Sequence, residues 1–236
     1  MKKIIHLAND RGFADHGWLK ATHSFSFAQF YDPQKVHFGL LRVLNDDIVA
    51  PAMGFGTHGH DNMEIVTIPL RGSLAHKDSL GSEGTITPGE VQIMSAGSGI
   101  QHSEFNASST EEVNLLQIWV FPKIRNITPR YDQKQFDQAK AKNRFQILVS
   151  PTEEEGAMWI NQDAVFALGN FDAGLAYSYT IKHRGNGAYF FVIEGSVELD
   201  GTQLSRRDAA GIYDTETVPF QVNENAKILV IEVPMQ

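Results

Sequence analysis

The sequence predicts an all-β protein with two β-barrels of the jelly-roll type in tandem, joined by a short linking helix. Three observations support this fold class: the density of short apolar segments, an internal repeat, and one polar stretch between the two halves. The chain has 236 residues, of which 42% are hydrophobic and 20% charged. This composition is ordinary for a globular protein and provides ample material for a core.

Short segments rich in β-branched, aliphatic and aromatic residues recur along the chain, separated by Gly, Pro, Asn and Asp. Their spacing of roughly 8–12 residues is typical of β-sandwiches and barrels. In the first half the predicted strands lie in "HFGLLRVLNDD", "MEIVTIPLRG", "GSLAHKDS", "GEVQIMSAG" and "VNLLQIWVFP". In the second half they lie in "FQILVS", "AVFALGNFD", "LAYSYTIKH", "AYFFVIEGSVELDG", "AAGIYD" and "KILVIEVP".

An internal repeat relates the two halves. The segments "PLRGSLAHKD" and "VIEGSVELDG" both place Gly-Ser between two strand-like runs, and aligning Gly72 with Gly195 gives an offset of 123 residues. The segment "PRYDQKQFDQAKAKNRF" is the best helical candidate, and we expect it to form a linker with one or two helical turns. We therefore predict an N-terminal barrel over 1–125, a linker over 126–145 and a C-terminal barrel over 146–236.

Composition and charge exclude several classes of function. The chain has no cysteine, which excludes disulfides, thiolate nucleophiles, Cys-ligated zinc and iron–sulfur clusters. The net charge is −8 and no Lys/Arg cluster is present, so we expect no direct binding of nucleic acid. Polar residues interrupt the N-terminal "MKKIIHLANDRGF", which does not resemble a signal peptide. No apolar run approaches the roughly 18 residues of a membrane span, so we expect a cytoplasmic protein.

The first half carries two pairs of potential metal ligands at the same spacing. His58 and His60 lie in "GFGTHGHDNMEIV", and His102 and Glu104 lie in "GSGIQHSEF". Residues i and i+2 of a strand face the same side, so two such pairs on neighbouring strands would offer three imidazoles and one carboxylate. Imidazole suits Fe, Ni, Cu and Zn, and a six-coordinate ion would keep two open positions. The same spacing also allows a closed, structural zinc site.

Other residues near these pairs have simpler interpretations. We interpret Asn45-Asp46-Asp47 as a turn and His76 as a surface or hydrogen-bonded histidine. The alternating aromatic residues of "THSFSF" are more typical of a strand core than of a substrate-binding wall. Gln117 and Trp119 share one face of a predicted buried strand, so we expect them either beside the ligands or in the core.

The repeat offset also makes a prediction about the second half. In the alignment of the two halves, Ile181 corresponds to His58 and His183 corresponds to His60. Since only one of the two histidines has a counterpart, we predict that the C-terminal barrel is degenerate and binds no metal.

These motifs resemble those of the cupin superfamily, and more specifically those of the bacterial pirin family. The pattern His58-x-His60-x₃-Glu64, followed by Gly72, resembles the first cupin motif, and a looser second motif contains His102. The second half resembles the family only weakly. The matching stretches, which cover most of the first 130 residues, are "HGWLKATHSFSF", "LRVLNDD", "GFGTHGHDNMEIVT", "GEVQIMSAGSGIQHSE" and "QIWVFP".

The resemblance implies a bicupin fold with one mononuclear site for a divalent transition metal in the N-terminal barrel. It implies His58, His60, His102 and Glu104 as the ligands. The implied metal is Fe(II), with Cu, Ni, Co, Mn or Zn as alternatives. Many cupins place their carboxylate ligand at the position of Glu64, but the resemblance to pirins gives that role to Glu104 and leaves Glu64 to support the ligands or the fold.

Some bacterial pirins resemble quercetin (flavonol) 2,3-dioxygenases, which implies a flavonol-like small molecule and O₂ as substrates. Glu104 is then the catalytic general base for the flavonol hydroxyl, and ring opening releases carbon monoxide. The alternative is a metal-binding regulatory pirin that interacts with a protein partner and has no physiological catalysis. A bicupin chain already contains the pair of barrels that single-cupin proteins obtain by dimerising, so we expect a monomer.

Overall fold

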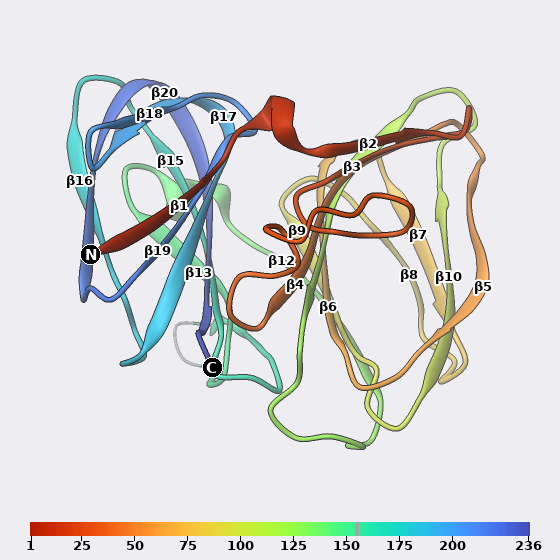
Figure 1. The fold of residues 1–236 in the computed structure, drawn as a ribbon. Helices are drawn as coiled ribbons and strands as arrows, with labels where there is room; N and C mark the ends of the chain where they lie inside the picture. The colour runs from red at the N-terminus through yellow and green to blue at the C-terminus, as the bar shows by residue number, and fades with distance from the viewer. Residues whose placement is uncertain (154–155) are drawn as a thin grey trace.

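The computed structural model describes residues 1–153 and 156–236, and every regular element longer than four residues in them is a β-strand. The strands form two cupin-type domains that lie side by side (Figure 1). The predicted all-β fold is therefore confirmed. In the described part of the chain, no helix has the length and the apolar character needed to cross a membrane.

The N-terminal domain consists of two facing sheets (Figure 1). The larger sheet contains, in spatial order, β12 (Arg130–Gln135), β9 (Glu90–Ser95), β6 (Glu64–Arg71), β11 (Val113–Val120), β4 (Leu41–Val49), β3 (Leu19–His23) and β2 (Gly12–Asp15). The smaller sheet contains β5 (Gly54–His60), β10 (Ile100–Asn106), β7 (Leu74–Asp78) and β8 (Glu83–Ile86). The two predicted ligand pairs therefore lie on adjacent strands, β5 and β10.

The C-terminal domain is one large sheet that curls around its own core (Figure 1). Its main path runs through β1 (Lys2–His6), β19 (Ala209–Tyr213), β17 (Asn186–Leu199), β20 (Thr217–Pro234), β15 (Val165–Phe171), β13 (Phe145–Ser150) and β14 (Met158–Trp159). Two further strands, β16 (Ala176–Thr180) and β18 (Thr202–Leu204), pair with β20 and β17. The first strand of the chain thus extends the sheet of the second domain, a pairing that the predicted limits of 1–125 do not anticipate.

The predicted linker contains little helix. Residues 130–135 form β12, which pairs antiparallel with β9 at the edge of the larger N-terminal sheet. The helical part is the four-residue 3-10 helix η2 (Gln138–Ala141), which the Asp137 side chain caps by accepting from the Ala139 N–H. A second 3-10 helix, η1 (Ala8–Asp10), follows β1. The linker therefore contains one short helical turn, η2, where the sequence predicts one or two turns.

Gly72 and Gly195 occupy equivalent bends in the two domains, as the repeat implies. Their φ angles are +76° and +80°, in the left-handed region that favours glycine. A Cβ atom at Gly72 would collide with the carbonyl oxygen of Glu112, and one at Gly195 with the carbonyl oxygen of Asn225. In both domains the bend therefore needs a glycine because a neighbouring strand passes close to it.

The largest apolar core lies between the two domains and not inside either of them. It joins the outer face of the larger N-terminal sheet, for example Leu44 and Ile118, to residues of the C-terminal sheet such as Phe191 and Leu229. A second extended core fills the C-terminal domain. The interior of the N-terminal domain holds only two small apolar clusters, around Val49 and around the Ile65 side chain.

Candidate metal centre

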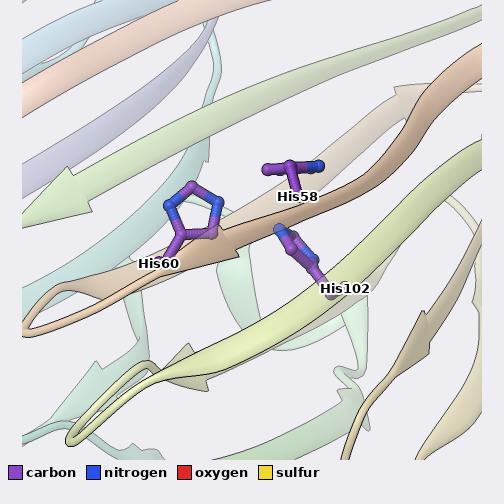
Figure 2. A group of neighbouring side chains, drawn as sticks. All are labelled: His58, His60 and His102. Atoms are coloured by element: carbon purple, nitrogen blue, oxygen red, sulfur yellow. The ribbon is translucent and has the colours of Figure 1, made fainter.

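The register of β5 and β10 brings three histidines together. The strands are antiparallel, His102 lies opposite His58, and His60 follows two residues later on β5. Since alternate residues of a strand share a face, the three rings stand on the same side of the sheet. Figure 2 shows them turned toward one another from the two neighbouring strands.

The three rings offer nitrogen atoms that all lie within 4.8 Å of one another. The ring centroids of His58 and His102 are 4.4 Å apart, and those of His60 are 4.9 Å from His58 and 5.0 Å from His102. His102 is 1% exposed, and the other two rings are partly buried. This spacing is short enough for one small ion to contact all three imidazoles.

Each of the three rings has an Nε2 atom that is available to bind a metal ion. The Nδ1 of His58 is 2.8 Å from the carbonyl oxygen of Gly56, and this contact leaves Nε2 available. The Nε2 atoms of His60 and His102 are buried without a hydrogen-bond partner among the described residues. Burial, together with the neighbouring imidazoles, lowers the pKa of His60 to about 4 and that of His102 to about 3. Both rings are therefore neutral near pH 7, the form that donates a lone pair to a metal.

Glu104 lies beside His102 but in a different grouping. A bulge after His102 shifts the register, so that Glu104 is opposite Phe55 on β5 and opposite His76 on β7. Its carboxylate falls within 4.8 Å of ligand atoms of His76 and His102. The side-chain amides of Gln92 and Gln117 donate to its two oxygens, at 3.2 and 2.9 Å. These two bonds fix the orientation of a carboxylate that is only 2% exposed.

His76 is a buried, hydrogen-bonded histidine and does not lie on the surface. Its Nε2 lies 3.1 Å from Asp78 Oδ2, its Nδ1 lies 3.5 Å from Nδ1 of His102, and its ring stacks on Tyr131. Burial raises the pKa of the Asp78 carboxyl, but the hydrogen bonds from His76 and from two main-chain N–H groups hold it below its ordinary value. His76 therefore links a carboxylate to one of the three clustered histidines.

Glu64 is buried away from both groups of potential ligands. Its Oε2 accepts hydrogen bonds from Ser95 Oγ at 2.8 Å and from the main-chain N–H of Asn161 at 3.1 Å. Asn161 belongs to the C-terminal half, so this glutamate connects the two domains. Burial raises the pKa of Glu64 to about 7.

A cavity of about 260 Å³ opens beside the histidines. This volume is close to the lower end of the roughly 300–1,000 Å³ range of small-molecule sites. Its walls combine aromatic rings with polar groups, and its lining residues are Phe27, Asn45, Asp47, Phe55, His58, His60, Glu104, Gln117 and Trp119.

Asn45 and Asp47 line this cavity. The interpretation of Asn45-Asp46-Asp47 as a turn is wrong. The three residues lie in the middle of β4, which is hydrogen-bonded on both sides, to β3 and to β11. Three consecutive polar residues resemble a turn because both faces of this strand need polar groups. The sequence offers no alternating signal here, because Val43, Asn45, Asp47 and Val49 share one face of the strand and are half apolar and half polar.

The residues that line the cavity also decide the interpretation of "THSFSF" and of the pair Gln117 and Trp119. Phe25 is a core residue, 1% exposed, as expected for "THSFSF", whereas Phe27 forms part of the cavity wall. Gln117 and Trp119 both face the cavity, and Trp119 Nε1 donates to Gln117 Oε1 at 3.1 Å. The sequence interpretation did not identify Gln92, which reaches Glu104 from β9 across the interior between the two facing sheets.

The residues that the repeat offset pairs with the two histidines of β5 do not lie at equivalent positions. Ile181 and His183 follow β16 in the connection to β17, and the His183 main-chain N–H donates to Glu232. The side chains of β16 that pack into the C-terminal core are Tyr177 and Tyr179. In the described residues of this domain, no group of three potential ligands comes together.

Comparisons with known proteins agree with this arrangement. A family model described as "Pirin" matches residues 5–120, and one described as "Quercetinase C-terminal cupin domain" matches residues 147–233. The protein named quercetin 2,3-dioxygenase from Escherichia coli K12 is 40% identical over 233 residues, which cover 98% of each chain. A pirin-like protein from Caulobacter vibrioides is 39% identical, over 94% of this chain and 95% of its own.

Solved structures give the same result. YhhW from Escherichia coli matches with a TM-score of 0.94 and 38% identity, over 99% of this chain and 98% of its own. The structure of the bacterial pirin YhhW in complex with nickel(II) matches with a TM-score of 0.93 and 37% identity, over 99% of each chain. Full-length similarity at this level, joined to a three-histidine cluster beside a cavity, establishes that the chain belongs to the pirin family.

Proposed function

We propose that this protein is a quercetin 2,3-dioxygenase that cleaves a flavonol with O₂ at a single divalent metal ion. The observation that carries the proposal is the cluster of imidazole nitrogens beside an aromatic-lined cavity, where two Nε2 atoms are buried without a partner. The name of the Escherichia coli relative supports the reaction and the substrate class.

We assign His58, His60 and His102 as ligands and Glu104 as the fourth. The nickel(II) complex of YhhW supports a divalent transition metal in this family, and we propose Fe(II) as the native ion. When bound, the ion would coordinate the flavonol and lower the pKa of its 3-hydroxyl.

The side chains of the site have separate roles in the proposed reaction. Glu104 accepts the proton of the 3-hydroxyl, and the amides of Gln92 and Gln117 keep its carboxylate oriented. Phe27, Phe55 and Trp119 form flat apolar walls that suit planar aromatic rings and exclude water from them.

The alternative function, regulation of a protein partner without catalysis, predicts the same metal site but no turnover. A monomer in the cytoplasm is a further part of the proposal. The extended core between the two domains supports a monomer, because it supplies within one chain the pairing that single cupins obtain by dimerising. Size-exclusion chromatography and cell fractionation test these two points.

Reconstitution with metal tests the proposed activity. The protein is stripped of metal, loaded separately with Fe(II), Cu(II), Mn(II), Ni(II) or Co(II), and mixed with quercetin while O₂ uptake is recorded. We expect O₂ uptake and loss of the flavonol absorbance with at least one ion, and neither with the stripped protein. Absence of turnover with all five ions would contradict the proposed dioxygenase and favour the regulatory function.

A further inference from the structure

Asp47 stands out among the cavity residues because its carboxyl group is buried without a partner. The residue lies on β4 between the strands β3 and β11, is 5% exposed, and lines the cavity. Its Oδ1 makes no hydrogen bond with any residue that the structure describes. Burying a polar group in this way costs free energy, so an unpartnered carboxyl at a cavity wall needs an explanation.

The polar groups around Asp47 do not compensate for this because they are bonded to one another. Asn45, two residues earlier on the same strand face, contacts His23, with 2.9 Å between the Asn45 Oδ1 and His23 Nδ1 atoms. Gln117 donates to Glu104 and accepts from Trp119. Asp47 is thus left available for a molecule that enters the cavity.

The nearest cationic side chains are also engaged elsewhere. Arg207 Nε donates to Asp46 Oδ2 at 2.6 Å, and Arg11 Nη1 lies 3.8 Å from the same oxygen, on the opposite face of β4. Burial and the nearby carboxylates of Asp46 and Glu104 raise the pKa of Asp47 to about 8, against the smaller opposing effect of Arg11. A carboxyl in this setting can exchange hydrogen bonds with a neutral hydroxyl group.

The rest of the cavity indicates what carries that hydroxyl. Phe27, Phe55 and Trp119 present aromatic surfaces, and the centroids of the Phe27 and Trp119 rings are 5.4 Å apart. If the metal ligands and Glu104 engage the 3-hydroxyl and 4-carbonyl of a flavonol, the remaining hydroxyl groups lie on its outer rings. A planar ligand held by these walls would place such a group near a carboxyl on the cavity surface.

We propose that the carboxyl group of Asp47 hydrogen-bonds a phenolic hydroxyl on an outer ring of the flavonol and so determines substrate preference. This inference rests on the proposed function. It assigns to Asp47 a role in binding and selection, with no part in holding the metal. A site built to bind a hydroxyl group discriminates against analogues that lack it, because its own polar group is then left unpaired.

The test compares two flavonols with two variants of the metal-loaded protein. Quercetin carries hydroxyl groups on both outer rings, whereas 3-hydroxyflavone carries only the 3-hydroxyl. We expect Asp47→Leu to lower kcat/KM for quercetin about tenfold and to change kcat/KM for 3-hydroxyflavone by less than about twofold. Metal content per protein, measured by mass spectrometry of the ions, should stay at the wild-type value.

Asp47→Asn provides a matched variant of the same size, which remains available if Asp47→Leu does not fold. It keeps one acceptor and one donor group, so its preference for quercetin should fall in the same direction but less. An equal change for the two flavonols, or no change for either, would overturn the inference. Failure of the wild-type protein to act on either flavonol is a different result, since it would overturn the proposed function as well.

Discussion

The two domains share a fold but fill their interiors in different ways. The N-terminal interior contains a cavity of about 260 Å³ beside three clustered histidines. The C-terminal interior is filled by aromatic rings whose centroids lie 4.9 to 6.5 Å apart, namely Phe145, Phe171, Tyr179, Phe190 and Phe220. In this chain the candidate site therefore lies in the domain whose interior packing leaves a cavity.

The difference begins on corresponding strands of the two domains. On β5 the residues that face the cavity are His58 and His60, whereas the inward residues of β16 are Tyr177 and Tyr179. The tyrosine rings join the aromatic cluster. Where β5 presents imidazoles to a cavity, β16 thus presents larger rings that pack as part of the core.

The buried glutamates of the domains show the same contrast. Glu232 in the C-terminal domain accepts hydrogen bonds from the Tyr179 hydroxyl, the Asn186 amide and two main-chain N–H groups. Glu64 in the N-terminal domain accepts two hydrogen bonds, and its Oε1 has no partner among the described residues. The domain with the cavity thus satisfies its buried charge less completely.

The largest effect that would sharpen this comparison comes from removing a histidine of the cluster. We expect His60→Ala and His102→Ala each to strip most of the metal, because each removes an imidazole from the set of three. Loss of an outer partner of a ligand weakens metal binding roughly 10- to 100-fold, and loss of a ligand should exceed that. Metal content after dialysis and quercetin turnover measure the effect.

His183→Ala is the matched control, because this histidine lies in the C-terminal domain, in the connection between β16 and β17, and belongs to no cluster of potential ligands among the described residues. We expect its metal content and turnover to equal those of the wild-type protein. Full metal occupancy in His60→Ala or in His102→Ala would contradict the assigned site.

A second comparison removes one aromatic ring from each domain and measures the effect on stability and on activity. Phe190→Ala empties a ring position that is 1% exposed and should lower the free energy of unfolding by about 3–5 kcal/mol, with metal content per folded protein unchanged. Phe55→Ala removes a ring that already borders the cavity, so it should cost less stability but reduce quercetin turnover. Thermal unfolding, metal analysis and kinetics distinguish the two. Equal stability losses would argue that the N-terminal interior is as tightly packed as the C-terminal one.

Local patterns in the sequence predict most of what lies within single strands. The alternation of ligand-type residues places His58 and His60 on one face, and the density of apolar segments gives the all-β fold. The cluster of three histidines follows once β5 and β10 are adjacent, which the resemblance to cupins implies.

Long-range pairing explains what the sequence could not predict. The polar residues of β4 face a cavity on one side and the Arg207 side chain of the other domain on the opposite side, so neither face reads as apolar. In the same way β12 is a polar edge strand that resembles a helix until its pairing with β9 is known. The pairing of β1 with β19 joins residues about 200 positions apart, and no local pattern encodes it.

The smallest expected effect concerns the incompletely satisfied Glu64. Its pKa in the folded protein is about 7, against an ordinary value of 4.5. Below pH 4.5 the carboxyl is protonated in both states, so its contribution to stability is fully present. Between pH 4.5 and pH 7 the carboxyl ionises in the unfolded state but stays largely protonated in the folded protein. Stability therefore falls over this range, and once the pH has risen through 7 the loss amounts to about 3 kcal/mol at 1.36 kcal/mol per pKa unit.

Glu64→Gln removes the charge but keeps an oxygen that can accept from Ser95 and Asn161. We therefore expect the melting temperature of this variant to fall less than that of the wild-type protein between pH 5 and pH 8. Glu198→Gln, at an exposed position of β17, is the control and should follow the wild-type curve. Parallel curves for Glu64→Gln and wild type would show that Glu64 is already satisfied in the folded state, and the contrast with Glu232 would then fail.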